Sequence, residues 1–308
     1  MLQKFNINDT VVTRLPIRAS MSDGAMLRGF RFQSENQPRG RRRKTNPVTT
    51  PLLCLATDLG NSKEHHRFAL SLASQEEAAQ RIFTLDLRAR GLSDSDGVGS
   101  SDVASDADDL ISFCDAQNLH HIDVVVSGFS AFVLFLAATK RPGLVRRLVL
   151  NDASAEFDAV GIARHNALVQ RADHPATWDL GAKQLKDMKG EEFPYFGDAD
   201  WMDLARQKWR DIDGRPVIDI AKGLVRWSNA GDFDSEQPSL WPQFAIFKDR
   251  PVLMVRGEFS GLVTSDIAAK TAAHHPELHL ILAKGQGHVP QLERGHLTEN
   301  VLTFLSDN

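Results

Sequence analysis

Eight short apolar segments, rich in Val, Ile, Leu and Phe and bounded by turn residues, recur along the chain and predict β-strands. From Pro51 onward they alternate with segments of helical periodicity, such as FALSLASQEEAAQ and FSAFVLFLAATK. This alternation predicts an α/β fold with an eight-stranded, mostly parallel sheet flanked by helices. The first two segments have no helix between them, which predicts a hairpin at one sheet edge. The predicted strands are VVTRLPIRAS (11–20), AMLRGFRFQ (25–33), PLLCLA (51–56), RIFTLDL (81–87), IDVVV (122–126), LVRRLVL (144–150), RPVLMVRG (250–257) and LHLILAKG (278–285).

The strand pattern stops between residues 156 and 248, where a polar, tryptophan-bearing and helix-like stretch intervenes. We interpret residues 156–248 as a helical cap inserted after the sixth strand, between the core segments 1–155 and 249–308. Insertions above such a sheet often form one wall of a ligand pocket. An ordinary helical subdomain without a ligand role is an equally open interpretation.

The charge balance favours no macromolecular partner, because the net charge of the 308 residues is only −4. Nucleic acid and an anionic membrane are therefore not expected partners, and the oligomeric state is left open.

No run approaches the roughly 18 apolar residues that a membrane span needs, and the first ten residues lack the apolar core of a signal peptide. Cys54 and Cys114 lie in apolar segments, which predicts buried free thiols and a reducing, cytoplasmic compartment. The basic segment from Arg39 to Lys44 is interpreted as a solvated loop, with a contact for an anionic partner as the alternative.

Four segments carry a resemblance to a known family. They are LDLRARGLSD (85–94), KRPGLVRRLVLND (140–152), RPVLMVRGEFSG (250–261) and KGQGHVPQLE (284–293). In these segments the chain resembles the α/β-hydrolase superfamily, specifically the cap-bearing group of esterases, lactonases and carbon–carbon bond hydrolases. The resemblance implies the α/β-hydrolase fold, a small-molecule substrate or ligand, and no cofactor. The sequence shows neither a glycine-rich dinucleotide fingerprint after a strand nor a His–Cys spacing typical of metal sites.

The family places its nucleophilic serine in a sharp strand-turn-helix elbow, which corresponds to VVVSGFSAF (124–132). An alignment without gaps from either flanking anchor places Gly128 at the serine position. A shifted elbow would make Ser130 the nucleophile, but it puts the bulky Phe132 where the family needs a small residue. A shift to Ser127 is the other alternative, and it places large residues at both small sites.

Of the other two residues of the family triad, the histidine is present in this sequence and the acid is not. Gly261 stands where the acidic residue is expected, whereas GQGHVP retains a histidine, His288, in the loop after the last strand. Asp152, directly after the sixth strand, is the best substitute for orienting His288, and a structural role in the LND turn is its alternative. The resemblance thus implies a degenerate catalytic triad.

The loop after the third predicted strand is expected to supply part of an oxyanion hole. Thr57 and Asp58 stand where the family commonly has His-Gly, so the backbone donors would be the amides of Leu59 and Phe129. A carboxylate at Asp58, if directed inward, would oppose a developing oxyanion.

Three hypotheses about function follow. The first is a binding protein or pseudoenzyme that holds a small apolar or carbonyl-containing molecule over Gly128, with little or no ester hydrolysis. This is favoured because losing the serine of a triad costs about a millionfold in turnover. The second is a hydrolase or lyase in which His288 is a general base. The third is a serine hydrolase with a shifted elbow at Ser130 or Ser127.

Overall fold

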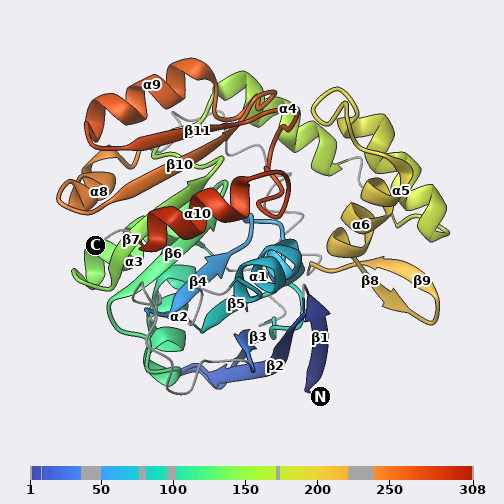
Figure 1. Ribbon diagram of the computed structural model, residues 1–308, viewed down its shortest axis with the longest axis horizontal. Coiled ribbons are helices and arrows are strands. Elements are labelled where there is room, and N and C mark those ends of the chain that lie inside the picture. Colours follow the sequence, from blue (N-terminus) through green and yellow to red (C-terminus); the bar gives the residue numbers. More distant parts are fainter. Residues whose placement is uncertain are drawn as a thin grey trace.

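The computed structural model describes residues 2–7, 9–35, 50–75, 81–95, 102–170, 174–220 and 239–306. Their main feature is a nine-stranded sheet in the order β1-β2-β3-β5-β4-β6-β7-β10-β11 (Figure 1). The basic segment from Arg39 to Lys44 lies outside the described residues. The sheet strands are β1 (Gln3–Ile7), β2 (Thr10–Ser20), β3 (Met26–Ser34), β4 (Leu52–Leu55), β5 (Ile82–Asp86), β6 (Ile122–Ser127), β7 (Val145–Asn151), β10 (Val252–Gly257) and β11 (His279–Ala283).

The predicted fold class is confirmed, with one correction to the number of strands. Strands β5, β4, β6, β7, β10 and β11 pair in parallel, and β1, β2 and β3 add an antiparallel edge. All eight predicted strands are present, but the sheet has a ninth, β1. Its sequence QKFNI contains no apolar run, because the strand lies at the sheet edge with most of its side chains exposed. Apolar patterning therefore gave no signal for it.

Helices cover both faces of the sheet (Figure 1). Side chains from α2, α3, α8 and α9 share one buried cluster with one face of the parallel strands, while those from α1 and α10 share a second cluster with the other face. Because both faces are covered, the central strands read as continuous apolar runs rather than as alternating patterns. The helices are α1 (His66–Ala73), α2 (Val103–Ala116), α3 (Ser130–Lys140), α4 (Ala159–Gln170), α5 (Trp178–Lys189), α6 (Asp198–Lys208), α8 (Trp241–Phe244), α9 (Ser265–His274) and α10 (Leu297–Ser306), with the 3-10 turns η1 (Ser62–His65) and η3 (Ala245–Phe247).

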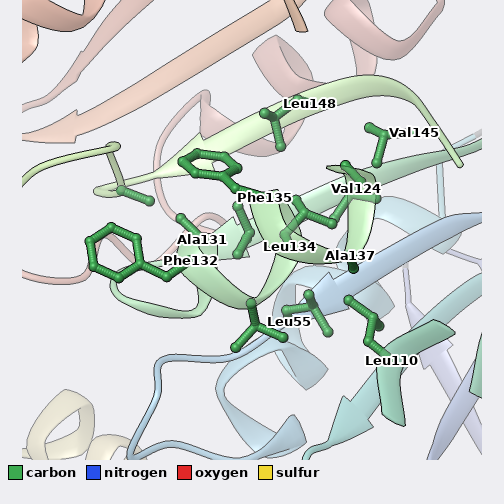
Figure 2. Close-up of a cluster of buried hydrophobic side chains, with 14 of the residues drawn as sticks. Leu55, Leu110, Val124, Ala131, Phe132, Leu134, Phe135, Ala137, Val145 and Leu148 are labelled. Atoms are coloured by element: carbon green, nitrogen blue, oxygen red, sulfur yellow. The ribbon is translucent and has the colours of Figure 1, made fainter. Parts of the chain in front are cut away.

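Helix α3 lies in the middle of the first cluster and fixes the turn that precedes it. Most of its side chains are buried, and Figure 2 shows Leu134 and Phe135 of this helix packed near Val124 and Leu148 of the adjacent strands. The helix ends at Lys140, shortly before Pro142, whose ring disfavours helical geometry in the residue before it. The turn between β6 and α3 is therefore held from both sides.

The segment predicted as a cap contains helices and a β-hairpin. Helices α5 and α6 share a separate apolar cluster with Trp209, the first residue of the strand pair β8 (Trp209–Ile212) and β9 (Arg215–Ile218). The hairpin corrects the expectation of a purely helical cap. Its two-residue turn is Asp213–Gly214, both at positive φ, a sequence typical of tight hairpins. Phe244 and Phe247, also within residues 156–248, pack in the α3 cluster instead, so the cap boundaries stay a prediction.

We expect Phe135→Ala to lower the free energy of unfolding by about 3–5 kcal/mol, because it removes a fully buried ring and leaves a cavity. The Phe135 ring lies 5.5 Å from that of Phe244 and 5.6 Å from that of Phe247 between centroids. Phe259→Ala is the matched control, since its side chain is 43% exposed and its loss should change stability little. Urea denaturation followed by circular dichroism measures both, and equal effects would contradict the packing described for α3.

Candidate active site

Gly128 occupies the sharp turn between β6 and α3. Its φ is +53°, a left-handed conformation that favours glycine and that the nucleophile elbow of the resembling family also requires. A β-carbon placed on Gly128 would lie 3.0 Å from Cε1 and 3.2 Å from Nε2 of His288. A side chain at this position would therefore meet the histidine ring, which would have to shift by a few tenths of an ångström to admit it.

His288 and Asp152 form a buried hydrogen-bonded pair. Nδ1 of His288 lies 2.8 Å from Oδ2 of Asp152, and both side chains are almost fully buried. Asp152 follows β7 directly, and His288 belongs to the loop between β11 and α10. The Asp152 carboxylate also accepts hydrogen bonds from the amide of Gly257 at 3.0 Å and from Oγ of Ser260 at 2.6 Å. Three donors thus converge on Asp152 and fix its orientation.

The second ring nitrogen of His288, Nε2, is not used in the pair with Asp152. When Nδ1 donates to Asp152, Nε2 of a neutral imidazole is an acceptor. Nε2 is buried and has no hydrogen-bond partner among the described residues. Since this atom faces the Gly128 turn, the pair has the orientation of a general base without the serine that it would normally activate.

The two alternative serines are not placed beside His288. Oγ of Ser127 accepts a hydrogen bond from Nδ2 of Asn151 at 3.0 Å and lies 3.3 Å from Nε2 of His65. Oγ of Ser130 is buried in the first turn of α3 and has no partner among the described residues. Ser127 thus belongs to a structural network below the site, and neither hydroxyl contacts the histidine.

Gly261 is not brought to the pair either. It lies exposed in the loop after β10, and a β-carbon placed on it would meet no atom within 4 Å. His288 already bonds Asp152 through Nδ1. The carboxylate that contacts His288 thus belongs to Asp152 at the end of β7, the residue that the sequence suggested for orienting the histidine.

A cavity of about 100 Å³ opens beside His288, between the core loops and the helices α5 and α6. Thr57 and Leu59 line it from the core, whereas Asp58, Gly128, Phe129 and Gly261 are not among its lining residues. The Phe129 ring packs instead on Phe157, at 4.2 Å between centroids. Of the residues predicted to form the substrate pocket, Leu59 therefore lies in the wall, and Gly128 sits next to the histidine.

The loop after β4 is held by Glu64. Its carboxyl oxygens accept hydrogen bonds from the amide and the hydroxyl of Thr57, both at 2.9 Å, and burial raises the pKa of Glu64. Burial also raises the pKa of Asp58, although Arg90, His288 and the amides of Asp58 and Leu59 oppose this shift. Oδ1 of Asp58 is buried and has no hydrogen-bond partner among the described residues.

Three basic side chains of the cap region face the cavity, and the sequence reasoning missed them. Lys189 donates a hydrogen bond from Nζ to the carbonyl oxygen of His288 at 2.7 Å. Burial, and then the charge of Lys189, lower the pKa of Lys208. Burial lowers the pKa of His165 well below its usual value, so this imidazole is neutral, and its ring lies 5.7 Å from that of His288.

One signal for Lys208 is present in the sequence. Trp201, Leu204, Ala205 and Lys208 follow the i, i+3, i+4, i+7 spacing of one helix face, and that face is turned inward. A lysine on an apolar helix face is unusual and indicates a buried or partly buried charge.

No group of three His, Cys, Asp or Glu side chains within the described ranges is arranged to hold a metal ion. Cys54 and Cys114 are free and buried, as expected. Among the described segments, none forms a helix long and apolar enough to cross a membrane.

Comparison with known proteins identifies the fold. No family profile matches the chain. The 2-(acetamidomethylene)succinate hydrolase of Mesorhizobium japonicum is 28% identical over 232 residues, covering 72% of this chain and 77% of that protein. An α/β hydrolase from Novosphingobium aromaticivorans superimposes with a TM-score of 0.80 at 22% identity, covering 95% of this chain and 98% of that one. The N-formylmaleamic acid deformylase of Pseudomonas putida S16 superimposes with a TM-score of 0.58 at 17% identity, covering 99% and 100%. The chain therefore has the α/β-hydrolase fold, and the resemblance to the α/β-hydrolase superfamily seen in its sequence is confirmed.

Proposed function

We propose that the protein hydrolyses a small carbonyl compound by general acid–base catalysis, without a covalent enzyme intermediate. The observation that carries this proposal is the His288–Asp152 pair, whose Nε2 faces the glycine at the nucleophile position. A buried polar pair is costly to retain unless it is satisfied or used. Asp152 fixes the orientation of the pair, and Nε2 of His288 has no hydrogen-bond partner among the described residues.

In the proposed reaction His288 activates a water molecule that enters from the cavity beside the histidine. Nε2 takes one proton from the water as its oxygen attacks the carbonyl carbon, and Asp152 stabilises the imidazolium that forms. The tetrahedral adduct then collapses, the bond to the leaving group breaks, and His288 returns the proton to that group. Water is consumed and the histidine ends in its starting state.

The developing oxyanion would receive one clear hydrogen bond. Phe129 stands at the N-terminal end of α3, where the amides are free of helical partners and the helix dipole is positive. The second expected donor, the Leu59 amide, is close to the Asp58 carboxyl group. The raised pKa of Asp58 favours its neutral form, which lessens its repulsion of an oxyanion.

The names of two relatives support this reaction class. One is named for hydrolysis of 2-(acetamidomethylene)succinate and the other for deformylation of N-formylmaleamic acid. Both compounds contain an amide carbonyl, the kind of group that a water molecule activated by His288 would attack. The sequence similarity is distant, so these compounds serve as starting points for a substrate screen.

Ligand binding without turnover is the second candidate function. It is favoured by one observation, the glycine at position 128, where the family has its nucleophile and where His288 faces no side chain that it could activate. Covalent serine catalysis has no such support, because Ser127 and Ser130 make no contact with His288.

We expect His288→Ala to lower kcat/KM about 10²- to 10⁴-fold on any substrate found in that screen, because the general base is lost. Asp152→Asn should also lower kcat/KM, since an amide can donate to Nδ1 and so turn Nε2 into a donor that cannot accept a proton from water. Steady-state kinetics with 2-(acetamidomethylene)succinate and N-formylmaleamic acid would measure both effects.

His296→Ala is the matched control, because its side chain is exposed and lies away from the pair. It should leave kcat/KM unchanged. Wild-type turnover that survives His288→Ala would reject the general-base proposal, while binding of a screened compound without turnover would favour the second candidate.

A serine restored at position 128 tests the geometry of the turn. In Gly128→Ser, the new hydroxyl group should reach Nε2 of His288 and become reactive, because the turn already has the left-handed backbone of an elbow. We expect covalent labelling by a fluorophosphonate probe and a burst of product with p-nitrophenyl acetate. The wild type should show neither. Stability should fall by about 1–3 kcal/mol, the usual cost of a side chain at such a φ.

Adding Ser130→Ala or Ser127→Ala to Gly128→Ser should leave the labelling intact, which assigns it to position 128. Labelling of the wild-type protein, removed by Ser130→Ala, would instead show that the elbow is shifted and that this is a serine hydrolase.

A further inference from the structure

We infer that the cavity beside His288 binds a small molecule bearing a carboxylate, with Lys208 and Lys189 as its positive partners. This inference deepens the proposed function and rests on it, because it names the substrate class of the same site. It comes from the charges that line the cavity rather than from the names of the relatives.

The lysines of the cap helices fall into two groups. Lys183 pairs with Asp187 and Lys186 pairs with Asp198, both on the exposed side of α5. Lys189 and Lys208 line the cavity instead, and neither has a carboxylate within 4.0 Å among the described residues. Two exposed cap lysines thus form ion pairs, whereas the two inward-facing ones form none among the described residues.

The two inward lysines also repel each other. The charge of Lys189 lowers the pKa of Lys208, in addition to the effect of burial. Lys189 is held in place by its hydrogen bond to the His288 carbonyl oxygen, which uses only one of its three protons. A bound carboxylate would relieve this repulsion and accept the remaining donors.

The acidic groups near the cavity do not form an ion pair with either lysine. Glu64 lines the cavity and its charge acts on Lys208, but its two carboxyl oxygens accept hydrogen bonds from Thr57, and burial raises its pKa. Glu192 accepts a hydrogen bond from the His288 amide at 3.2 Å and is not part of the cavity wall. The charge of Asp58 also acts on Lys208, from the core side, but burial raises the pKa of Asp58. Both lysines therefore remain available to a ligand.

The size and the remaining walls of the cavity indicate a small ligand. Its volume is about 100 Å³ and it is partly open to solvent, so only a few heavy atoms of a ligand can be buried in it. Leu185, Met188 and Phe193 supply an apolar wall for a short carbon skeleton, and neutral His165 has an unpaired, buried Nε2 that can hydrogen bond to it. A carboxylate at the lysines would leave the carbonyl end of such a molecule near His288.

Calorimetric titration with succinate and with its neutral isostere succinamide tests this inference. We expect wild-type protein to bind succinate at least tenfold more tightly than succinamide. Lys208→Met should weaken succinate binding at least tenfold, Lys208→Arg should largely restore it, and Lys183→Met, the matched control on the exposed face, should have no effect. Circular dichroism would verify that each variant is folded.

No detectable succinate binding, equal affinity for the two compounds, or an unchanged affinity in Lys208→Met would overturn the inference. The same titration on His288→Ala separates it from the proposed function, because succinate binding should survive in that variant. Succinate binding combined with His288-independent turnover would reject only the general base. His288-dependent turnover without succinate binding would reject only the carboxylate site.

Discussion

The hydrogen bond between Nδ1 of His288 and Oδ2 of Asp152 joins two loops that are 136 residues apart in sequence, and the candidate site depends on it. The sheet makes this contact possible. In the parallel register Ser127 lies opposite Asn151, so the residues that follow them, Gly128 and Asp152, emerge side by side at the carboxyl edge. Gly128 and Asp152 both have a positive φ, so the chain leaves the sheet directly after each of the two neighbouring strands. The site is thus a consequence of strand register, and helix α3 holds it from below.

The two departures from the family triad have different physical meanings. Gly261 removes an acid from a place that the histidine does not use, because Asp152 occupies Nδ1 and is itself fixed by Gly257 and Ser260. Gly128 removes only a side chain and keeps the backbone geometry of the elbow. In the sequence, the two glycines at triad positions favoured a binding protein with little or no catalytic activity. Because Asp152 pairs with His288, the absence of an acid at position 261 no longer argues against chemistry, and we therefore propose general-base catalysis ahead of ligand binding alone.

Sequence patterns predicted the strands whose burial demands apolar residues and missed those that are stabilised in other ways. Strand β1 is held by pairing to β2, which leaves no trace in hydropathy. The β8–β9 hairpin had a readable signal in its Asp-Gly turn, but the helical periodicity around it prevailed. Asp152 and Gly128 followed from motif alignment because the family constrains strand ends. Lys189 and Lys208 belong to no family motif, and although helical spacing places Lys208 on an apolar face, it does not show that this face meets the core beside His288.

Burial shifts the pKa values of the acidic and the basic groups around the cavity in opposite directions. It raises the pKa of Asp58 and Glu64 and lowers the pKa of Lys208, so burial favours the neutral form of each group, and the charges of Glu64 and Asp58 oppose this shift for Lys208. A carboxylate entering from the cap side would reverse this trend for Lys208 and strengthen it for Asp58. Asp58 would then be more fully protonated, and its carboxyl group would repel an oxyanion less. Binding of an anion at the lysines and stabilisation of charge near His288 are therefore coupled through the electrostatics of one small, poorly solvated space.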